Sequence, residues 1–298
     1  MNIILLVIRV LINVAFITLL ERKILGYSQL RKGPNKVGFG GLLQPFNDAI
    51  KLFTKEIITP FTRNRNFMLM GPILGILFRL IIWLSVPINW SLSISLSIVI
   101  VYIILSINIY PLLMSGWASN RNYAMIGRIR GIAQTISYEI RFALIIIFFT
   151  LTISTLSLND LISLGSYFHM FIMFAPIIGI WLLICLAETN RTPFDFAEGE
   201  SELVSGFNIE YGSVGFALIF MAEYARIFFI SSIASIIFSP FPITSFLGLF
   251  ISVLIVFFWV WTRTTLPRYR YDILISLAWF TILPLSLLLV VLIISIKI

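Results

Sequence analysis

Three glutamates lie within or at the ends of long apolar stretches of the sequence: Glu139, Glu188 and Glu223. A charged side chain at the centre of a membrane costs roughly 2.5–3.5 kcal/mol on insertion scales, so such residues usually face a cavity or a pathway. Because burial away from water favours the neutral form of a carboxyl group, these side chains can take up and release protons near neutral pH. Each glutamate could instead pair with an arginine or cap a helix. The presence of three such glutamates favours a path for protons or other cations.

An acidic segment, 188–213, adds more carboxylates to this set. Pro193 and Gly199 favour turns in it, and aromatic and small residues alternate with the acids. A run of charge is usually a solvated loop, but this composition predicts a segment that packs against another surface. Six of the 13 carboxylates of the chain lie here: Glu188, Asp195, Glu198, Glu200, Glu202 and Glu210.

The sequence lacks the residues that a disulfide, a metal site or a bound cofactor would need. The single cysteine, Cys185, excludes an internal disulfide and an iron–sulfur cluster held by thiolates of this chain. The single histidine, His169, excludes a haem held by two histidines of the chain and any histidine-rich metal site. No phosphate-binding loop or dinucleotide fingerprint is present. We therefore expect no metal site and no cofactor bound by this chain itself.

The composition of the chain is that of an integral membrane protein. Of its 298 residues 59% are hydrophobic and 11% are charged, and the mean hydropathy is +1.03. Soluble domains carry about 25% charged residues, so no water-soluble fold could cover this much apolar surface. Because no internal repeat or low-complexity linker divides the sequence, we expect residues 1–298 to form a single polytopic membrane domain.

The apolar residues are arranged in continuous stretches that suit membrane helices. A helix needs about 20 apolar residues to cross the hydrocarbon core, whereas the strands of a membrane barrel alternate in polarity. The sequence therefore predicts an all-α membrane protein with eight transmembrane helices. They are expected at about 2–20, 67–88, 93–115, 132–155, 167–187, 214–238, 245–262 and 273–296.

The basic residues report the orientation of these helices. Sixteen of the 21 lysines and arginines fall in the loops of one side, and Lys297 alone falls on the opposite side. Cytoplasmic or matrix-type loops carry such an excess, so both termini are expected on the translocated side of the membrane. The net charge of +8 thus indicates topology, not nucleic-acid binding.

The segment 42–56 predicts a helix that lies along the membrane surface. Apolar residues recur at helical spacing on one face, and polar ones, among them Asp48, Lys51 and Lys55, share the other. Taken alone, such a helix is most often a surface anchor.

Several motifs resemble subunit 1 of the NADH:ubiquinone oxidoreductases, the family of respiratory complex I. The likeness runs from about residue 13 to 280, and Glu-Thr-Asn-Arg-Thr-Pro-Phe-Asp at 188–195 is its most specific part. The other motifs are Leu-Glu-Arg-Lys at 20–23, Arg-Lys-Gly-Pro-Asn at 31–35, Gln-Pro-Phe at 44–46, Lys-Leu-Phe-Thr-Lys-Glu at 51–56 and Leu-Pro-Arg-Tyr-Arg-Tyr-Asp at 266–272.

The resemblance implies a ubiquinone channel and a path for protons. In the family the first helix, the amphipathic helix and the sixth helix frame the channel, and the acidic segment lies beneath the quinone cavity. The channel residues implied are Arg22, Arg31, Asp48, Lys51, Phe53, Phe220, Tyr224 and Arg270. The carboxylates implied for the proton path are Glu139, Glu188, Asp195, Glu198, Glu200, Glu202 and Glu223.

The resemblance also implies a setting for the chain. It places the protein in the mitochondrial inner membrane, with both termini on the intermembrane-space side. Its expected partners are membrane lipid, the quinone-site subunits of the peripheral arm and the neighbouring subunits of the membrane arm, without nucleic acid. Ubiquinone is the expected substrate, and FMN and the iron–sulfur clusters belong to partner subunits.

Two other functions are compatible with this sequence. A stand-alone secondary transporter for protons or cations would need the buried acids and no quinone, and a structural anchor would need neither. A transporter should purify and move ions alone, whereas a complex I subunit should come with many partners.

Five arginines lie where members of the family tend to carry serine or another small residue: Arg63, Arg79, Arg121, Arg141 and Arg226. No acid within 67–88 can pair with Arg79. Many invertebrate mitochondria read AGA and AGG as serine, where the standard code reads arginine. We therefore hypothesise that several of these five are serines in the natural protein. The alternative is that they are genuine arginines that pair with Glu139 and Glu223.

Overall fold

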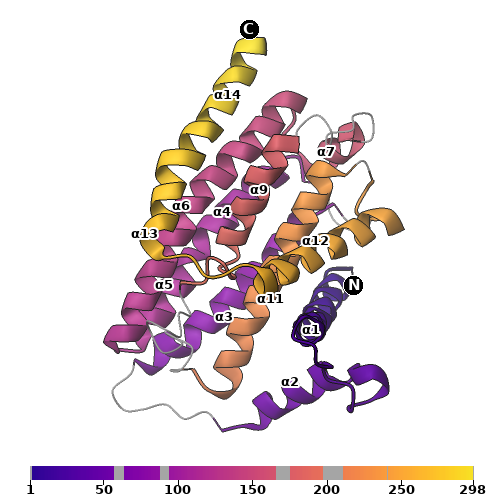
Figure 1. The fold of residues 1–298 in the computed structure, drawn as a ribbon, viewed down its shortest axis with the longest axis vertical. Coiled ribbons are helices and arrows are strands. Elements are labelled where there is room, and N and C mark those ends of the chain that lie inside the picture. Colours follow the sequence, from indigo (N-terminus) through magenta and orange to yellow (C-terminus); the bar gives the residue numbers. More distant parts are fainter. Residues whose placement is uncertain are drawn as a thin grey trace.

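The fold of the chain is all-helical in the computed structural model, which describes residues 2–56, 64–87, 94–165, 175–196, 211–239 and 241–297. Within these ranges no strand occurs. Figure 1 shows a bundle of long helices. In chain order they are α1 (Asn2–Ser28), α2 (Gln44–Thr54), α3 (Arg65–Ile81), α4 (Ser97–Ile107), α5 (Ile109–Ala118), α6 (Asn122–Ile153), α7 (Leu158–Gly165), α9 (Ala175–Glu188), α11 (Ser213–Phe238), α12 (Phe246–Thr265), α13 (Tyr271–Ser276) and α14 (Leu283–Lys297). Short 3-10 turns follow Gly38 and Ile81, and a π-helical segment, Leu277–Ile282, joins α13 to α14.

Seven helical stretches of the described residues are long and apolar enough to cross a membrane. They are Ile3–Ser28, Arg65–Ser85, Ser97–Ala118, Asn122–Ile153, Ser213–Phe238, Phe246–Thr265 and Tyr271–Lys297. For the described residues this finding confirms an all-helical fold with several helices that could cross a membrane. Of the eighth stretch predicted, 167–187, residues 167–174 lie outside the described residues. The rest falls in α9, which is 14 residues long, so an eighth span stays a prediction.

Two helix boundaries were predicted wrongly. The sequence placed the end of the first span near residue 20, but α1 continues to Ser28 and so includes Glu21, Arg22 and Lys23. The fourth span was expected to begin at 132, but α6 begins at Asn122. In both places charged residues suggested that the chain had left the membrane. The helices continue because other elements supply partners for these charges.

Helix α11 lies at the centre of the bundle and is buried over most of its length. A helix that is apolar around its whole circumference belongs in a core, and small residues let its neighbours approach closely. The hydroxyl groups of Ser231, Ser232 and Ser235 each donate to a carbonyl three residues earlier in the same helix, at 2.6–2.7 Å. These polar side chains are therefore satisfied without a partner from another helix.

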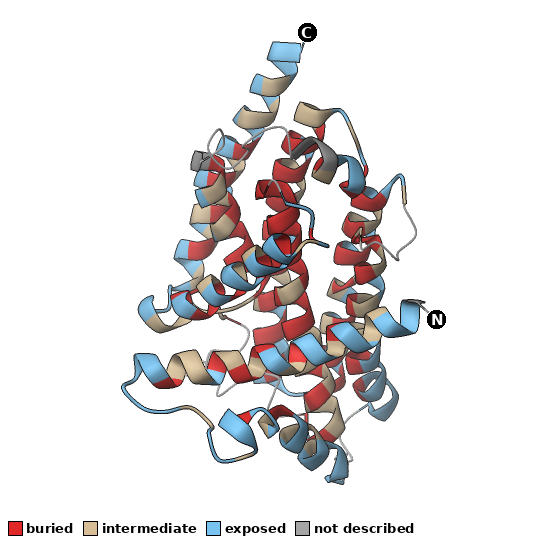
Figure 2. Cartoon of the chain, turned by 90° about the vertical axis from the view of Figure 1, so that its right-hand side faces the viewer, coloured by how far each residue is buried: buried red, intermediate tan, exposed pale blue. Residues whose placement is uncertain are grey.

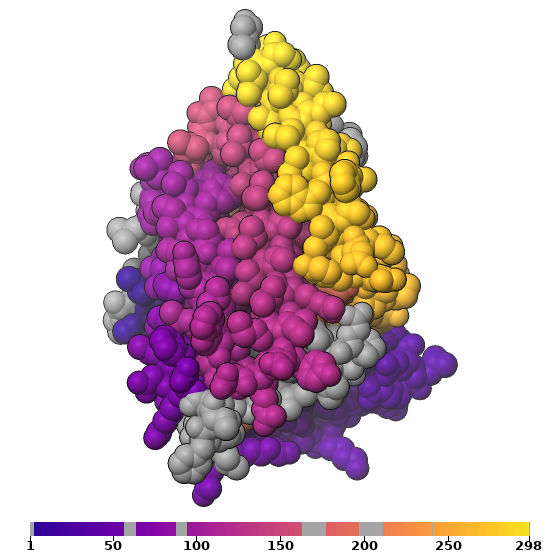
Figure 3. Space-filling model, turned by 90° about the vertical axis from the view of Figure 1, so that its left-hand side faces the viewer, coloured from indigo at the N-terminus to yellow at the C-terminus, as the bar shows by residue number. Residues whose placement is uncertain are grey.

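The first helix and the last span lie at the edges of the bundle. Figures 1 and 2 show that α1 crosses the other helices instead of running along them, with much of its surface exposed. The last span follows α6 along one side and its end projects beyond the rest, as Figures 1 and 3 show.

The segment after α1 folds back and brings α2 against α1 and α11. A glycine at position 41 makes this turn possible, because its φ is +82° and a Cβ atom there would lie 2.0 Å from the carbonyl oxygen of Pro34. Pro45 stands at the start of α2, where a missing N–H costs no hydrogen bond. Helix α2 thus occupies the range predicted for the surface helix, whose place in a membrane stays a prediction.

Candidate functional site

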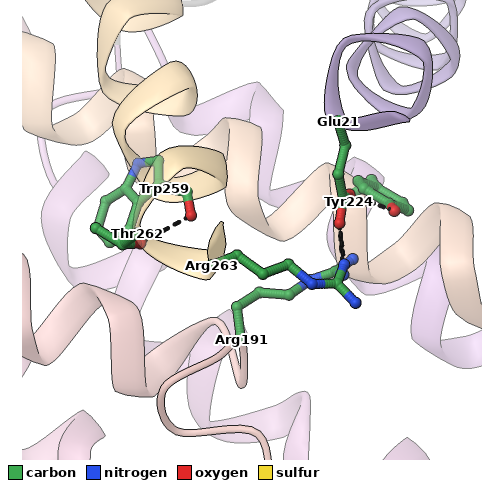
Figure 4. Close-up of polar contacts among 6 residues, drawn as sticks. All are labelled: Glu21, Arg191, Tyr224, Trp259, Thr262 and Arg263. Carbon is green, nitrogen blue, oxygen red and sulfur yellow. Dashed lines mark hydrogen bonds and ion pairs between the residues drawn. The ribbon is translucent and has the colours of Figure 1, made fainter. Parts of the chain in front are cut away.

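Glu21 is the centre of a buried polar cluster that joins four parts of the chain. Glu21 lies in the last third of α1 and is 5% exposed. The hydroxyl of Tyr224 on α11 donates to its Oε2 at 2.6 Å, and Arg263 on α12 forms an ion pair with its Oε1. Arg191, which follows α9, places Nη1 3.5 Å from the same Oε1. Figure 4 shows both guanidinium groups converging on this carboxylate. We call these four residues the Glu21 cluster.

The charges of the Glu21 cluster do not cancel. It holds one carboxylate and two guanidinium groups, and the guanidinium of Arg191 also lies 4.6 Å from the centre of the Tyr224 ring. The side chain of Arg263 is 35% exposed, compared with 12% for Arg191 and 6% for Glu21. Arg263 therefore gives the cluster an accessible positive edge, and guanidinium N–H groups donate readily to oxygen atoms of a bound molecule.

An aromatic row on α11 ends at this cluster. Phe216, Phe220 and Tyr224 follow one another at intervals of four residues, which places them on one face of the helix. The ring centres of Phe216 and Phe220 are 4.3 Å apart, and those of Phe220 and Tyr224 are 6.4 Å apart. The structure thus brings together Phe220 and Tyr224, two of the predicted channel residues.

A second polar contact joins α1 to α2 beside the cluster. Arg22 pairs with Asp48 at 2.5 Å between Nη1 and Oδ2, and Gln44 donates to the other oxygen of Asp48 at 2.9 Å. The rings of Phe16 on α1 and Phe46 on α2 also meet edge to face, with centres 6.2 Å apart. Predicted channel residues Arg22 and Asp48 therefore contact each other directly.

Other predicted channel residues do not join these contacts. Lys51 and Phe53 are exposed on α2, and Arg31 is exposed in the turn after α1, where it donates to the side chain of Gln29 at 2.9 Å. Arg270 is exposed and pairs with Asp272 at 3.0 Å. In the described part of the chain it is Arg263, not Arg270, that reaches the Glu21 cluster from this segment.

A second set of charged residues includes the three glutamates of apolar stretches, of which Glu188 makes a direct ion pair. Glu188, at the end of α9, is 3% exposed and forms an ion pair with the buried Arg226 of α11. At longer range the charge of Arg226 attracts Glu139 of α6 and repels Arg79 of α3. Arg79 in turn interacts with Glu223. We call these five residues the acid network.

The first part of the acidic segment packs within the chain. The ring of Phe194 stacks on Tyr269 with centres 5.6 Å apart, and Phe196 meets Tyr271 at 5.7 Å. The backbone N–H of Tyr269 donates to the carbonyl of Pro193 at 3.1 Å. Asp195 is half-buried here. The predicted acids Glu198, Glu200 and Glu202 lie outside the described residues.

The arginines at positions where family members tend to carry serine or another small residue differ in their burial. Arg79, Arg141 and Arg226 are buried, and each has one buried side-chain nitrogen without a hydrogen-bond partner among the described residues. Arg141 donates from Nε to the carbonyl of Ala278 at 2.6 Å in the π-helical segment. Arg121 is exposed before α6, and Arg63 lies outside the described residues.

Sequence reasoning missed the central residue of the site. The charged group at 21–23 is typical of the border of a span, and Arg263 by its position is typical of a loop charge. Two signals mark Glu21 in the sequence: it belongs to the Leu-Glu-Arg-Lys motif, and it directly follows an apolar stretch of 20 residues. Its partners lie 170 to 242 residues away, which no local pattern shows.

Comparison with known proteins identifies the family. The family profile described as NADH dehydrogenase matches residues 1–294. The NADH-ubiquinone oxidoreductase chain 1 of Aedes aegypti is 52% identical over 284 residues, which cover 95% of this chain and 91% of the relative. That of Locusta migratoria is 48% identical over 288 residues (96% and 92%), and that of the bat Emballonura alecto is 45% identical over 296 residues (96% and 92%). The chain therefore belongs to the NADH dehydrogenase family, which includes chain 1 of the NADH-ubiquinone oxidoreductases.

Proposed function

We propose that this chain, a membrane subunit of an NADH-ubiquinone oxidoreductase, frames the channel by which ubiquinone reaches its reduction site. The Glu21 cluster is the observation that carries this proposal. It lies where α1, α11 and α12 meet, beside α2, and it joins an aromatic row to a group of hydrogen-bond donors. A quinone head group has a flat ring and two acceptor oxygens, so it suits aromatic faces and guanidinium donors.

The acid network would then link quinone chemistry to proton movement. Arg191 belongs to the Glu21 cluster and Glu188, three residues earlier, belongs to the acid network, so the two groups share one short turn. A change of charge near Arg191 would therefore move the turn and with it the side chain of Glu188. Glu139, Glu188 and Glu223, with Asp195 and the acids Glu198, Glu200 and Glu202, would hold the first protons on the way to neighbouring membrane subunits.

The proposal includes the setting that the family implies. The chain would lie in the mitochondrial inner membrane with both termini on the intermembrane-space side, in contact with lipid, peripheral-arm subunits and other membrane-arm subunits. FMN and the iron–sulfur clusters would belong to those partners, since this chain has one cysteine, which is buried. A stand-alone transporter fits less well, because the relatives at 45–52% identity are named as one chain of an oxidoreductase.

The substitution Glu21→Gln in the assembled complex tests the proposal. It keeps the size of the side chain and removes the charge that holds Arg191 and Arg263, and breaking a buried charge pair typically costs about 3–5 kcal/mol. We expect the Michaelis constant for a short-tailed ubiquinone to rise about tenfold, whereas NADH oxidation by a water-soluble artificial acceptor stays unchanged.

The matched control is Asp160→Asn, which makes the same chemical change at an exposed position on α7. We expect wild-type quinone kinetics in this variant. A wild-type Michaelis constant in an assembled Glu21→Gln complex would contradict the proposed channel.

A further inference from the structure

Gln134 of α6 holds both sides of the turn that follows α9. Its side chain is fully buried. The amide nitrogen Nε2 donates to the carbonyl of Ala187 at 2.9 Å and to the carbonyl of Phe194 at 2.7 Å. These acceptors lie just before and just after the turn 188–193. Both hydrogens of one amide are used, so a single side chain fixes the two ends of the turn against α6.

The turn held in this way contains one member of each polar group described above. Glu188 belongs to the acid network and is 3% exposed. Arg191 reaches Glu21 and lies over the ring of Tyr224. Because Ala187 directly precedes Glu188, the hydrogen bonds of Gln134 set how far these two side chains lie from each other and from α6.

The neighbours of Gln134 on the same face of α6 support this arrangement. Arg130 and Tyr138 stand four residues before and after it, so the three side chains share one face of the helix. The guanidinium of Arg130 lies 5.6 Å from the centre of the Tyr271 ring, and the hydroxyl of Tyr138 donates to the carbonyl of Leu274 at 3.3 Å. This face of α6 therefore binds the turn through Gln134 and the last span through its neighbours.

We propose that Gln134 is a positioning residue for the quinone reaction, which acts through Arg191 on the Glu21 cluster and through Glu188 on the acid network. The inference rests on the proposed function of the chain. Without the amide of Gln134, the carbonyls of Ala187 and Phe194 each lose one hydrogen bond. The turn is then free to shift relative to α6. The Glu21 cluster and the acid network lose their common support together.

The test uses Gln134→Met in the assembled complex, since methionine has a similar length and no donor. The control is Thr135→Val at the next residue, whose buried hydroxyl donates to the carbonyl of Ile132 within α6 at 3.0 Å. We expect the Michaelis constant for a short-tailed ubiquinone to rise about fivefold in Gln134→Met and to change less than about 1.5-fold in Thr135→Val. If Gln134→Met does not assemble, Gln134→Asn, which keeps the amide and shortens its reach, replaces it with the same expectation.

A double-mutant cycle with Glu21→Gln separates positioning from general loosening of the structure. If Gln134 acts through Arg191 on Glu21, Gln134→Met should raise the Michaelis constant less than about twofold in the Glu21→Gln background. The same fivefold rise in both backgrounds would overturn the inference. A wild-type Michaelis constant in Gln134→Met together with a raised constant in Glu21→Gln would also overturn the inference. That outcome would leave the proposed function standing. Normal constants for both single variants would instead contradict the proposed function itself.

Discussion

Glu21 is a buried carboxylate whose charge is exceeded by that of its two guanidinium partners. An isolated charge in this setting would be very unfavourable, and pairing with good geometry and additional hydrogen bonds offsets that cost. Tyr224 supplies such a hydrogen bond at 2.6 Å, while Arg191 and Arg263 supply the opposite charges. Because Glu21, Tyr224 and Arg263 come from different helices, the cluster also fixes the relative positions of α1, α11 and α12.

The residues of the site could be predicted from the sequence only in part. The family resemblance indicates Phe220, Tyr224 and Asp48. The structure places Tyr224 on Glu21, Phe220 next to Tyr224, and Asp48 on Arg22. The buried carboxylates could be found from hydropathy alone, because a charge within an apolar stretch is conspicuous. The pairing of Glu21 with Arg263 could not be found, because it joins residues 242 positions apart.

Arg79, Arg141 and Arg226 are the residues whose identity matters most for the acid network. Each keeps a buried nitrogen without a hydrogen-bond partner in the described part of the chain, which is costly for a guanidinium. A serine can satisfy its hydroxyl within its own helix, as the buried serines of α11 do. Serine at 79 and 226 would also free the three acids of the network from these two guanidinium groups.

We therefore predict that peptides of the natural protein carry serine at positions 79, 141 and 226. The measurement is the mass of peptides that cover these positions, made with a protease that does not depend on arginine. Peptides over Arg191 and Arg263 serve as controls and should carry arginine. Arginine masses at all three positions, or CGN codons in the gene, would refute this prediction.

At the scale of helices, the apolar stretches predicted the positions of the spans better than the charged residues predicted their ends. Of the eight spans predicted from apolar stretches, seven overlap the helical stretches that are long and apolar enough to cross a membrane, and the eighth stays a prediction. The boundaries failed at α1 and α6, where charged residues lie inside a helix because α2, α11, α12 and the last span hold them. In a polytopic protein a charge marks the edge of a span only when no other helix supplies a partner.

Helix α2 allows a direct test of its role. Asp48 is held by Arg22 and Gln44, whereas Lys51 on the same helix is exposed. If α2 frames the quinone entrance, Asp48→Ser should raise the Michaelis constant for ubiquinone about threefold and Lys51→Ser by less, because only the first change breaks a contact with α1. Steady-state kinetics of both assembled variants provide the measurement. Unchanged constants in both would return α2 to the role of a surface anchor.

In the described part of the molecule, a mainly apolar interior encloses a few polar groups, and apolar side chains also cover much of the surface. Figure 2 shows the buried residues in the centre of the bundle, and the outer faces of α1, α12 and α14 carry many exposed apolar side chains. This distribution suits lipid and neighbouring subunits. The Glu21 cluster and the acid network are two interior polar groups that draw on several helices, and the turn that Gln134 holds contains a residue of each.

The most direct measurement of the central claim is the position at which ubiquinone meets this chain. A photoreactive azido-ubiquinone, activated in the working complex, should label peptides from residues 17–28 of α1 and 216–224 of α11, since these carry Glu21, Phe220 and Tyr224. Excess unlabelled ubiquinone should suppress that labelling, whereas lipid-facing peptides of α14 should show only weak labelling that does not respond to competition. Competed labelling confined to peptides outside α1, α2 and α11 would contradict the account.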